Sequence, residues 1–514
     1  MKKMLLLLLS FILLLACVPT PEEEIVVNKG NQNEMIELSQ EEVTINASPS
    51  ESAETARLDY AAAFGIPAHL TLELPIRDGV HQVSIDADII TPEAALPVVR
   101  VFPGAFDQTL VTAFWDTLIG DTVMYRDDSM TGARRQPTKA EIAEDLKTLY
   151  ELIDQPARWS DRMFASREEI ETEIEELKTA YQTAPDDVPP REIATGLLET
   201  ETLTLEGTSE TAHRIGLHAY TDDYGSYTSF LVENNSDNSE PILAKYSDGW
   251  GAIGTDKHAE LSYHRKSITN WTNHNNVQRI VLHRNDPIPE FLQGVLTVTP
   301  DEAAGMLEAV LRAAGVDDIL RVSTITAFYG PYHNDETRTV AGYELSATRY
   351  VNGVPMNPLG GVGAMSEDRW SRSYTPYWQY ETVDACVDND GIYSFRWSGL
   401  LALSDTITQI SSLMPFSRMQ ETLEARLPIT EPCYSWTSDL AVTEAHTHIT
   451  EIRLGLWLVR EQNEFGKGLL VPCYCLYGTY SEQREGVTRP YRREGLLYVV
   501  NAVDGSLIDP QKGY

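Results

Sequence analysis

The chain has 514 residues, with 40 Lys and Arg against 77 Asp and Glu, which gives a formal charge of −37. A nucleic-acid binder neutralises phosphates with a basic surface, so this charge excludes that class of protein. With 42% apolar and 23% charged residues, the composition is typical of a globular chain and excludes a largely disordered or multi-span membrane protein. At about 150 residues per domain, we expect about three domains.

The N-terminus carries a short export signal. Lys2 and Lys3 precede an apolar run over residues 4–16, which is shorter than the roughly 20 residues of a membrane-spanning helix. The run ends in Leu14-Leu15-Ala16-Cys17, which resembles the lipobox of bacterial lipoproteins. That resemblance implies that a signal peptide, residues 1–16, is removed and that Cys17 carries a diacylglycerol and becomes the new N-terminus. An ordinary secretory signal that ends in a chance cysteine is the alternative.

If Cys17 is lipidated, the protein is extracytoplasmic and is held on the outer face of the cell membrane by acyl chains such as palmitate. Residues 17–60 then have the composition of a tether. From residue 18 to residue 60 there are ten acidic residues against Lys29 and Arg57, and no aromatic residue precedes Tyr60. Such a segment buries too little apolar surface to offset its ordering entropy, so we expect a disordered, extended and self-repelling spacer.

The region 61–200 is expected to be an α+β unit. Apolar residues alternate over residues 70–74 and 83–87, which predicts two strands, and a helix is expected over residues 106–118. Two further helices begin with capping boxes, Thr138-x-x-Glu141 and Ser166-x-x-Glu169, each followed by an apolar stripe of helical period. We expect these two helices to form an antiparallel pair.

Two regions complete the predicted organisation. Residues 201–290 hold short apolar runs separated by turn sequences, which predicts an antiparallel β-rich region that ends in a linker at residues 285–290. In residues 291–514, Thr299-Pro300-Asp301-Glu302 predicts a helix start, and two strands are expected over residues 320–328 and 340–351, the second of which ends at the Asn352-Gly353 turn. A second helix over residues 416–427 is again followed by strands. The fold class is therefore α+β, multi-domain, with antiparallel sheets and flanking helices.

The C-terminal region resembles a known repeat. Residues 298–315 with residues 343–355 look like one PepSY-type unit, and residues 470–474 with residues 498–508 look like the end of a second. Tandem units of this kind are similar to the YycH/YycI accessory proteins, which are membrane-tethered regulators outside the cell in Gram-positive bacteria. The whole chain also resembles an uncharacterised clostridial lipoprotein family that has the same Pro-Thr-Pro-Glu sequence after the lipid cysteine. These resemblances imply a regulatory or binding role and carry over no catalytic residue.

Four cysteines remain beyond Cys17, namely Cys386, Cys433, Cys473 and Cys475. An even number in an exported chain permits disulfides, with three possible connectivities, and buried free thiols are the alternative. A sharper alternative is a zinc site in which His446 and His448 join Cys473 and Cys475. The two-residue spacings differ from the usual zinc-knuckle gaps, so we predict no metal ligand.

No common catalytic fingerprint occurs in the sequence. H-E-x-x-H, G-x-S-x-G, S-x-x-K and the phosphate-binding G-x-x-x-x-G-K-[ST] are all absent, and Asp388 to Gly391 lacks the ligands of an EF-hand and predicts a hairpin turn. The acidic pair Asp222 and Asp223 means little among 77 acids, and the aromatic stretch 370–380 favours packing over a ligand platform. We therefore predict no catalytic residue and no cofactor.

The sequence indicates a membrane-anchored lipoprotein that binds or regulates an envelope protein or peptide. The first alternative is an envelope hydrolase without a recognisable motif. A cleft in which a histidine and a carboxylate converge, both with shifted pKa values, would favour this alternative. The second is a solute-binding lipoprotein, which would need two α/β lobes around a pocket. The predicted partners are a membrane, through the lipid, and an envelope protein or peptide, with no nucleic acid.

Overall fold

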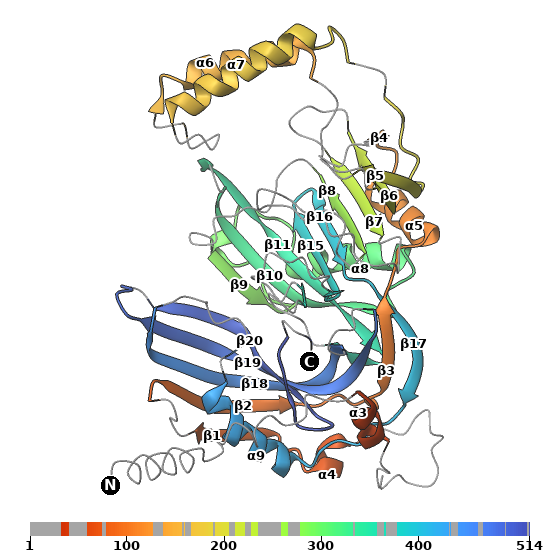
Figure 1. The fold of residues 1–514 in the computed structure, drawn as a ribbon, viewed down its shortest axis with the longest axis vertical. Coiled ribbons are helices and arrows are strands. Elements are labelled where there is room, and N and C mark those ends of the chain that lie inside the picture. The colour runs from red at the N-terminus through yellow and green to blue at the C-terminus, as the bar shows by residue number, and fades with distance from the viewer. Residues whose placement is uncertain are drawn as a thin grey trace, which may run out of the picture. The chain divides into compact units, whose positions relative to one another are not determined.

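The computed structural model describes residues 32–40, 59–74, 79–126, 137–156, 159, 166–188, 191–204, 211–221, 228–234, 259–265, 278–332, 335–356, 364–365, 378–430, 432, 440–460, 466–488, 490–510 and 513. The chain divides into two compact units (Figure 1). Unit 1 combines Met1–Arg100 with Asp405–Tyr514, and unit 2 is Val101–Ser404. This division differs from the contiguous regions expected from the sequence, because the boundaries at residues 200 and 290 both fall inside unit 2.

The α+β class is confirmed, with antiparallel sheets and helices in both units. The chain passes from unit 1 to unit 2 within β3 (Val98–Pro103) and returns within β17 (Leu401–Thr408). Among the helices that the structure describes, none has the length and apolarity that crossing a bilayer requires.

Unit 1 is built on the smaller of two large sheets, in which the order of strands is β1-β2-β18-β19-β20-β21. Its elements are α3 (Gln32–Ser39), α4 (Tyr60–Phe64), β1 (His69–Leu74), β2 (His81–Ile90), α9 (Phe416–Arg426), the 3-10 turn η3 (Leu427–Ile429), β18 (Val442–Arg460), β19 (Gly468–Arg484), β20 (Tyr491–Asn501) and β21 (Leu507–Ile508).

The first two strands form as the apolar alternation predicts. Leu70 lies opposite Ala87 and Leu72 opposite Ile85, so the alternating residues of β1 and β2 share one face. β2 then pairs in parallel with β18, and His446 lies beside Gln82. This parallel pairing joins the two ends of the chain into one unit, which no local sequence pattern indicates.

The expected extended spacer differs from the structure over Gln32–Ser39, which form helix α3. Met35 and Ser39 are buried, and the Ser39 carbonyl accepts a hydrogen bond from the Ser412 amide at 3.0 Å. The Asn501 Nδ2 atom lies 3.3 Å from the Met35 sulfur. The acidic composition of residues 17–60 thus conceals one short apolar segment that packs onto unit 1. The rest of the expected tether up to residue 58, apart from Gln40, lies outside the described residues, and so does Cys17.

Unit 2 is built on the larger sheet, in which the order of strands is β4-β6-β7-β8-β16-β15-β11-β10-β9. Its elements are β4 (Tyr125–Arg126), α5 (Gln108–Leu118), α6 (Lys139–Leu152), α7 (Arg167–Thr183), β5 (Glu199–Thr204), β6 (Thr211–Tyr220), β7 (Ser229–Asn234), β8 (Glu260–His264), β9 (Gln278–Leu282), the 3-10 turn η2 (Glu290–Leu292), α8 (Pro300–Ala313), β10 (Leu320–Tyr332), β11 (Asp335–Val351), β12 (Val354–Pro355), β13 (Ala364–Met365), β14 (Trp378–Gln379), β15 (Thr382–Asp388) and β16 (Gly391–Ser398).

Helices α5 and α8 pack on one face of the larger sheet. Phe114 of α5 lies with its ring 5.0 Å from Phe395 of β16, and Leu307 and Leu311 of α8 are fully buried in the same core. The predicted start of α8 is confirmed, because Thr299 and Glu302 form a capping box and Pro300 occupies the first turn.

The predicted antiparallel helix pair is confirmed in α6 and α7, which lie side by side (Figure 1). The Lys139 amide at the start of α6 bonds the Pro185 carbonyl beyond the end of α7, at 2.9 Å. Arg167 at the start of α7 pairs with Asp154 beyond the end of α6. The pair encloses a small apolar cluster of its own that includes Leu149.

The predicted turns form where the sequence places them. Asn352 and Gly353 both have positive φ, which suits the two-residue turn between β11 and β12. Asp388 and Gly391 close the hairpin of β15 and β16. The antiparallel meander expected in residues 201–290 is confirmed from β6 to β8, but β8 pairs next with β16 and β9 pairs with β10.

The predicted linker at residues 285–290 differs from the structure, because it joins β9 to η2 inside unit 2 and leads directly to the fully buried Leu292. A repeated element order is present, because α8 precedes the antiparallel hairpin β10–β11 and α9 precedes the antiparallel hairpin β18–β19. The two hairpins belong to different sheets.

Candidate binding site on the larger sheet

The second face of the larger sheet carries polar side chains beside a small buried cluster that includes Phe328 and Cys386, and the polar pattern is clearest in β16. Phe395 and Trp397 point into the core beneath α5 and α8, so Ser394, Arg396 and Ser398 point to the opposite face. The polar–apolar alternation over residues 394–398 is visible in the sequence and indicates a polar face.

The register of the sheet aligns this polar face across neighbouring strands. Arg396 lies opposite Ser262 of β8 on one side and Asp384 of β15 on the other, and Asp384 lies opposite Ser346 of β11. Two residues before Arg396, and therefore on the same face, Ser394 lies opposite His264. We call the polar strip the set of Glu260, Ser262, His264, Glu344, Ser346, Asp384, Ser394, Arg396 and Ser398.

Arg396 organises one end of the polar strip. Its Nη2 atom donates to Glu260 Oε2 at 2.8 Å, and its Nε atom donates to Ser398 Oγ at 3.0 Å. The Ser398 hydroxyl donates in turn to Glu260 at 3.1 Å. The Arg396 side chain is 51% exposed, so its orientation is fixed while part of the guanidinium faces solvent.

His264 is held by a serine on the next strand. Its Nδ1 atom lies 3.1 Å from Ser394 Oγ. Burial lowers the pKa of His264, and the positive charge of Arg396 lowers it further, while Glu260 acts in the opposite direction. The ring is therefore neutral at neutral pH.

The pKa of Asp384 is raised, whereas that of His264 is lowered. Burial raises the pKa of its carboxyl group above the ordinary value, although the 2.7 Å hydrogen bond from Ser346 and the charge of Arg396 oppose this shift. Glu344 lies two residues before Ser346 in β11, on the same face, and raises the Asp384 pKa further. Two titratable groups with shifted pKa values thus lie on one face of one sheet.

These two groups do not form a catalytic relay. His264 bonds Ser394 and Asp384 bonds Ser346, and the register places Arg396 between them. No carboxylate among the described residues bonds His264, so the serine–histidine pair lacks the third group that orients the ring in a nucleophilic triad. The described residues of the polar strip therefore form no nucleophilic triad.

The polar strip extends to the exposed edge strand β9. Arg279 of β9 reaches over β10 and donates from Nη1 to Glu344 Oε2 at 2.7 Å. Its neighbours Ile280 and Val281 are 45% and 69% exposed. The sequence pattern predicts strands in this region but does not distinguish the edge strand.

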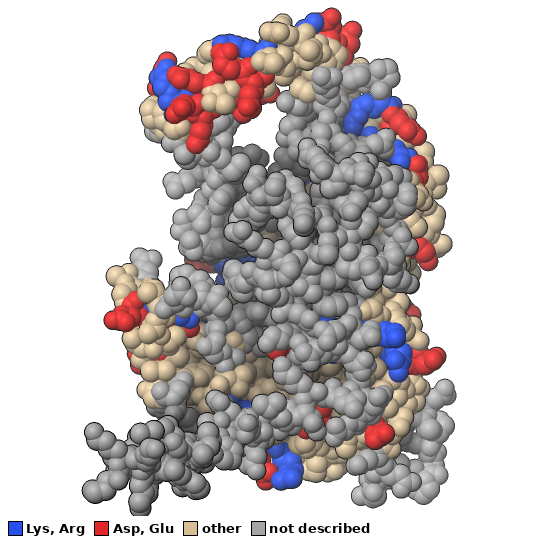
Figure 2. Space-filling model, viewed as in Figure 1, with Lys and Arg blue, Asp and Glu red and all other residues tan. Residues whose placement is uncertain are grey.

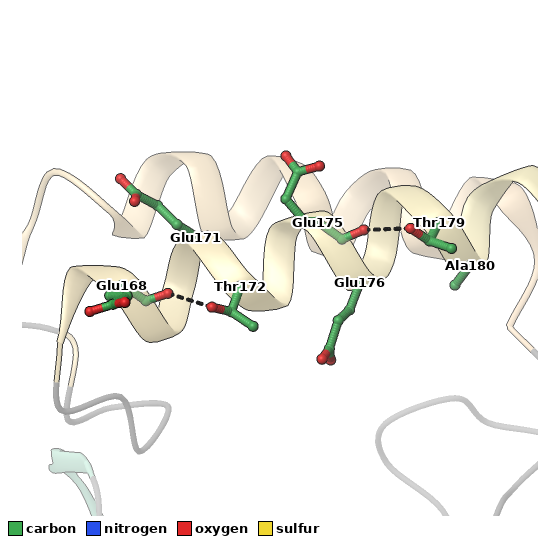
Figure 3. Close-up of a pocket in the computed structure, with 7 residues that line it drawn as sticks. All are labelled: Glu168, Glu171, Thr172, Glu175, Glu176, Thr179 and Ala180. Carbon is green, nitrogen blue, oxygen red and sulfur yellow. Dashed lines mark hydrogen bonds between the residues drawn. The ribbon is translucent and has the colours of Figure 1, made fainter.

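Helix α7 carries a second polar surface, a shallow acidic face (Figure 3). It is formed by Glu168, Glu171, Thr172, Glu175, Glu176, Thr179 and Ala180. Figure 3 shows Glu171 and Glu175 on the opposite side of the helix from Glu176, so their carboxylates do not converge. Acidic side chains are prominent on this part of the surface in Figure 2. A binding site needs polar groups that point toward one another, so we assign no site to this face of α7.

The structure describes three of the four cysteines beyond Cys17. Cys386, Cys473 and Cys475 are buried thiols that are not joined in a disulfide, as the second alternative expected, while Cys433 lies outside the described residues. Burial raises the pKa of Cys473 well above its ordinary value, which keeps the thiol protonated and unreactive.

The zinc alternative is wrong. Cys475 lies opposite Arg453 of β18, five positions along the strand from His448. His446 bonds Glu444, and His448 bonds the Ser84 hydroxyl at 3.0 Å. No cluster of metal-ligand residues occurs in the described part of the chain. Of the other weak candidates, Asp222 and Asp223 lie outside the described residues, as does most of the aromatic stretch 370–380.

Comparison with known proteins adds little to this geometry. No family model matches the chain, and no curated protein matches it. Among solved structures, the chain is similar to an uncharacterized protein from Eubacterium rectale, with a TM-score of 0.38 and 11% sequence identity, over 86% of this chain and 93% of that one.

Proposed function

We propose that this protein is a lipid-anchored lipoprotein on the outer face of the cell membrane of a Gram-positive bacterium, where it binds or regulates an envelope protein or peptide. The lipobox-like sequence that ends at Cys17 supports the location. The resemblance of the C-terminal region to PepSY-type units supports the regulatory role. The lack of common catalytic motifs in the sequence favours binding over chemistry.

The observation that carries the binding role is the polar strip. Arg396 of the strip and Arg279 of the neighbouring strand β9 are each held by a carboxylate and stay partly exposed. Side chains oriented in this way lose little conformational entropy when they bind a partner, so they favour recognition of a polar backbone or side chain. A strip that ends at an exposed edge strand suits an extended segment better than a compact solute.

In-cell photo-crosslinking tests this function. A photoreactive residue is placed at Val281 in unit 2 and, as a control, at Ile90 in unit 1, which is also exposed. We expect a discrete protein adduct from position 281 that is lost when Cys17→Ser releases the chain from the membrane. Adducts from position 90 alone would contradict the assignment to unit 2, and no adduct from either position would contradict the binding role.

A further inference from the structure

We propose that β9 is a strand-addition site that takes an extended, cationic segment of the partner protein. This inference rests on the proposed binding function and specifies its chemistry. In strand addition, the partner's backbone forms hydrogen bonds with a free sheet edge, and pockets for alternate side chains give selectivity.

The position of β9 supplies the free edge. Among the described strands, β9 pairs with β10 alone and ends the larger sheet. The N–H and C=O groups of a strand point alternately to its two sides, so every second residue of Gln278–Leu282 directs its polar groups away from β10. A partner strand therefore finds the hydrogen-bonding pattern that an inner strand offers.

The side chains of β9 supply apolar surface on both faces. Ile280 lies opposite the core residue Ala327, so it extends the core face of the sheet. Val281 lies opposite Thr326 and therefore on the polar face. An added strand covers both side chains at once and removes their apolar surface from water, which favours binding.

The usual protection of an edge strand is missing from β9. Exposed edges are normally guarded by charges, prolines or bulges. Arg279 is the one charged residue of β9, and its guanidinium is bound to Glu344 within the sheet. By contrast, β1 at the edge of the smaller sheet exposes His69, Thr71 and Glu73 and buries Leu70 and Leu74.

The net charge of the chain indicates which kind of segment binds at the edge of β9. With a net charge of −37, the protein repels acidic segments and also a second copy of itself. A cationic segment is attracted over a long range and is then held by backbone pairing. The occupant that fits is an extended segment of alternating β-branched residues with Lys or Arg.

The test uses the full chain and synthetic peptides in which valine alternates with threonine. One peptide carries lysine at both ends, and a second carries glutamate at those positions. The chain variants are Val281→Lys and the matched control Val295→Lys, an equal charge change at another exposed valine of unit 2. Hydrogen exchange follows the amides of Gln278–Leu282 while fluorescence anisotropy measures affinity.

We expect the lysine peptide to slow amide exchange in β9 and to bind at least about tenfold more tightly than the glutamate peptide. Val281→Lys should weaken binding about tenfold, and Val295→Lys less than about twofold. Equal weakening by both variants would overturn the site, as would a dimer of the chain that Val281→Lys dissolves. If the chain still captures its envelope partner in cells through another surface, the strand-addition site is wrong and the binding function survives.

Discussion

Two central strands, β19 in unit 1 and β16 in unit 2, show how differently the two sheets are used. In β19, residues 469–476 are all buried, including the consecutive Cys473, Tyr474 and Cys475, so both faces of the strand are packed. In β16, Phe395 and Trp397 face the core, while Ser394, Arg396 and Ser398 face the other way. A strand packed on both faces has a continuous apolar run, whereas a strand with one polar face alternates. The smaller sheet is therefore structural, and the larger sheet carries the candidate site.

The largest expected effect tests how unit 2 supports its polar groups. Glu381 accepts hydrogen bonds from Arg349 Nη2 at 2.7 Å, from Trp397 Nε1 at 3.1 Å and from the Leu401 amide at 3.3 Å. The side chains of Arg349 and Glu381 are both buried. Glu381→Ala leaves the guanidinium buried without its carboxylate, so we expect a loss of about 3–5 kcal/mol in the free energy of unfolding.

Urea denaturation followed by tryptophan fluorescence measures this loss. The matched control is Glu344→Ala, which removes a carboxylate from the half-exposed pair with Arg279 and should cost less than about 1 kcal/mol. Similar losses for the two variants would show that burial does not distinguish these ion pairs.

The next effect tests the tight packing of the smaller sheet. Gly478 of β19 lies where an added Cβ would stand 1.9 Å from the carbonyl oxygen of His448 in β18. Because the obstacle is backbone, Gly478→Ala must separate the two strands, and we expect it to cost about 3 kcal/mol.

Gly305→Ala is the control of opposite sign. Gly305 lies within helix α8, and nothing stands within 4 Å of the added Cβ. Alanine favours the helix over glycine by about 1 kcal/mol, so this variant should gain stability. Thermal unfolding of both variants decides the point, and a Gly478→Ala protein as stable as the parent would contradict the close approach of β18 and β19.

The sequence predicts those parts of the fold whose partners are close in the chain. Thr299 and Glu302 are three residues apart, and Asn352 and Gly353 are adjacent, so the helix start and the turn follow from local pattern. His264 and Ser394 are 130 positions apart, and Ser84 and His448 are 364 apart. No periodicity in a single segment indicates such pairings, so neither the polar strip nor the assembly of unit 1 from both ends of the chain was predicted.

Helix α3 shows a second reason for a missed element. The composition of residues 17–60 is acidic on average, and an average hides one apolar turn around Met35. Because Met35 is buried against partners far along the chain, including Asn501, only the tertiary structure shows that the segment is ordered.

A smaller effect tests the local signal that did succeed. The Thr299 hydroxyl accepts the Glu302 amide, and the Glu302 carboxylate accepts the Thr299 amide at 2.8 Å. Thr299→Ala removes one side of this capping box and should cost about 1 kcal/mol, while Thr299→Ser keeps the hydroxyl and should cost much less. Denaturation midpoints compare the two variants, and the prediction fails if serine costs as much as alanine.

The smallest expected effect is the pH dependence of stability that two partly buried titratable groups on the polar face of the larger sheet produce. Burial raises the pKa of Asp384 above its ordinary 3.8, so its contribution to stability is full below that value and is lost as pH rises through the folded pKa. Burial lowers the pKa of His264 below its ordinary 6.5, so its contribution is full above that value and is lost as pH falls through the folded pKa.

Asp384→Asn should therefore gain stability relative to the parent as pH rises from acid to neutral, and His264→Gln should gain relative to the parent as pH falls. Denaturation midpoints across this range, at constant ionic strength, measure both slopes. Opposite slopes are expected because burial opposes the charged form of both groups, and an acid and a base charge on opposite sides of their pKa values. Two parallel curves would mean that the polar face is as fully hydrated as an ordinary outer face of a sheet, and the polar strip would then lose its partly desolvated character.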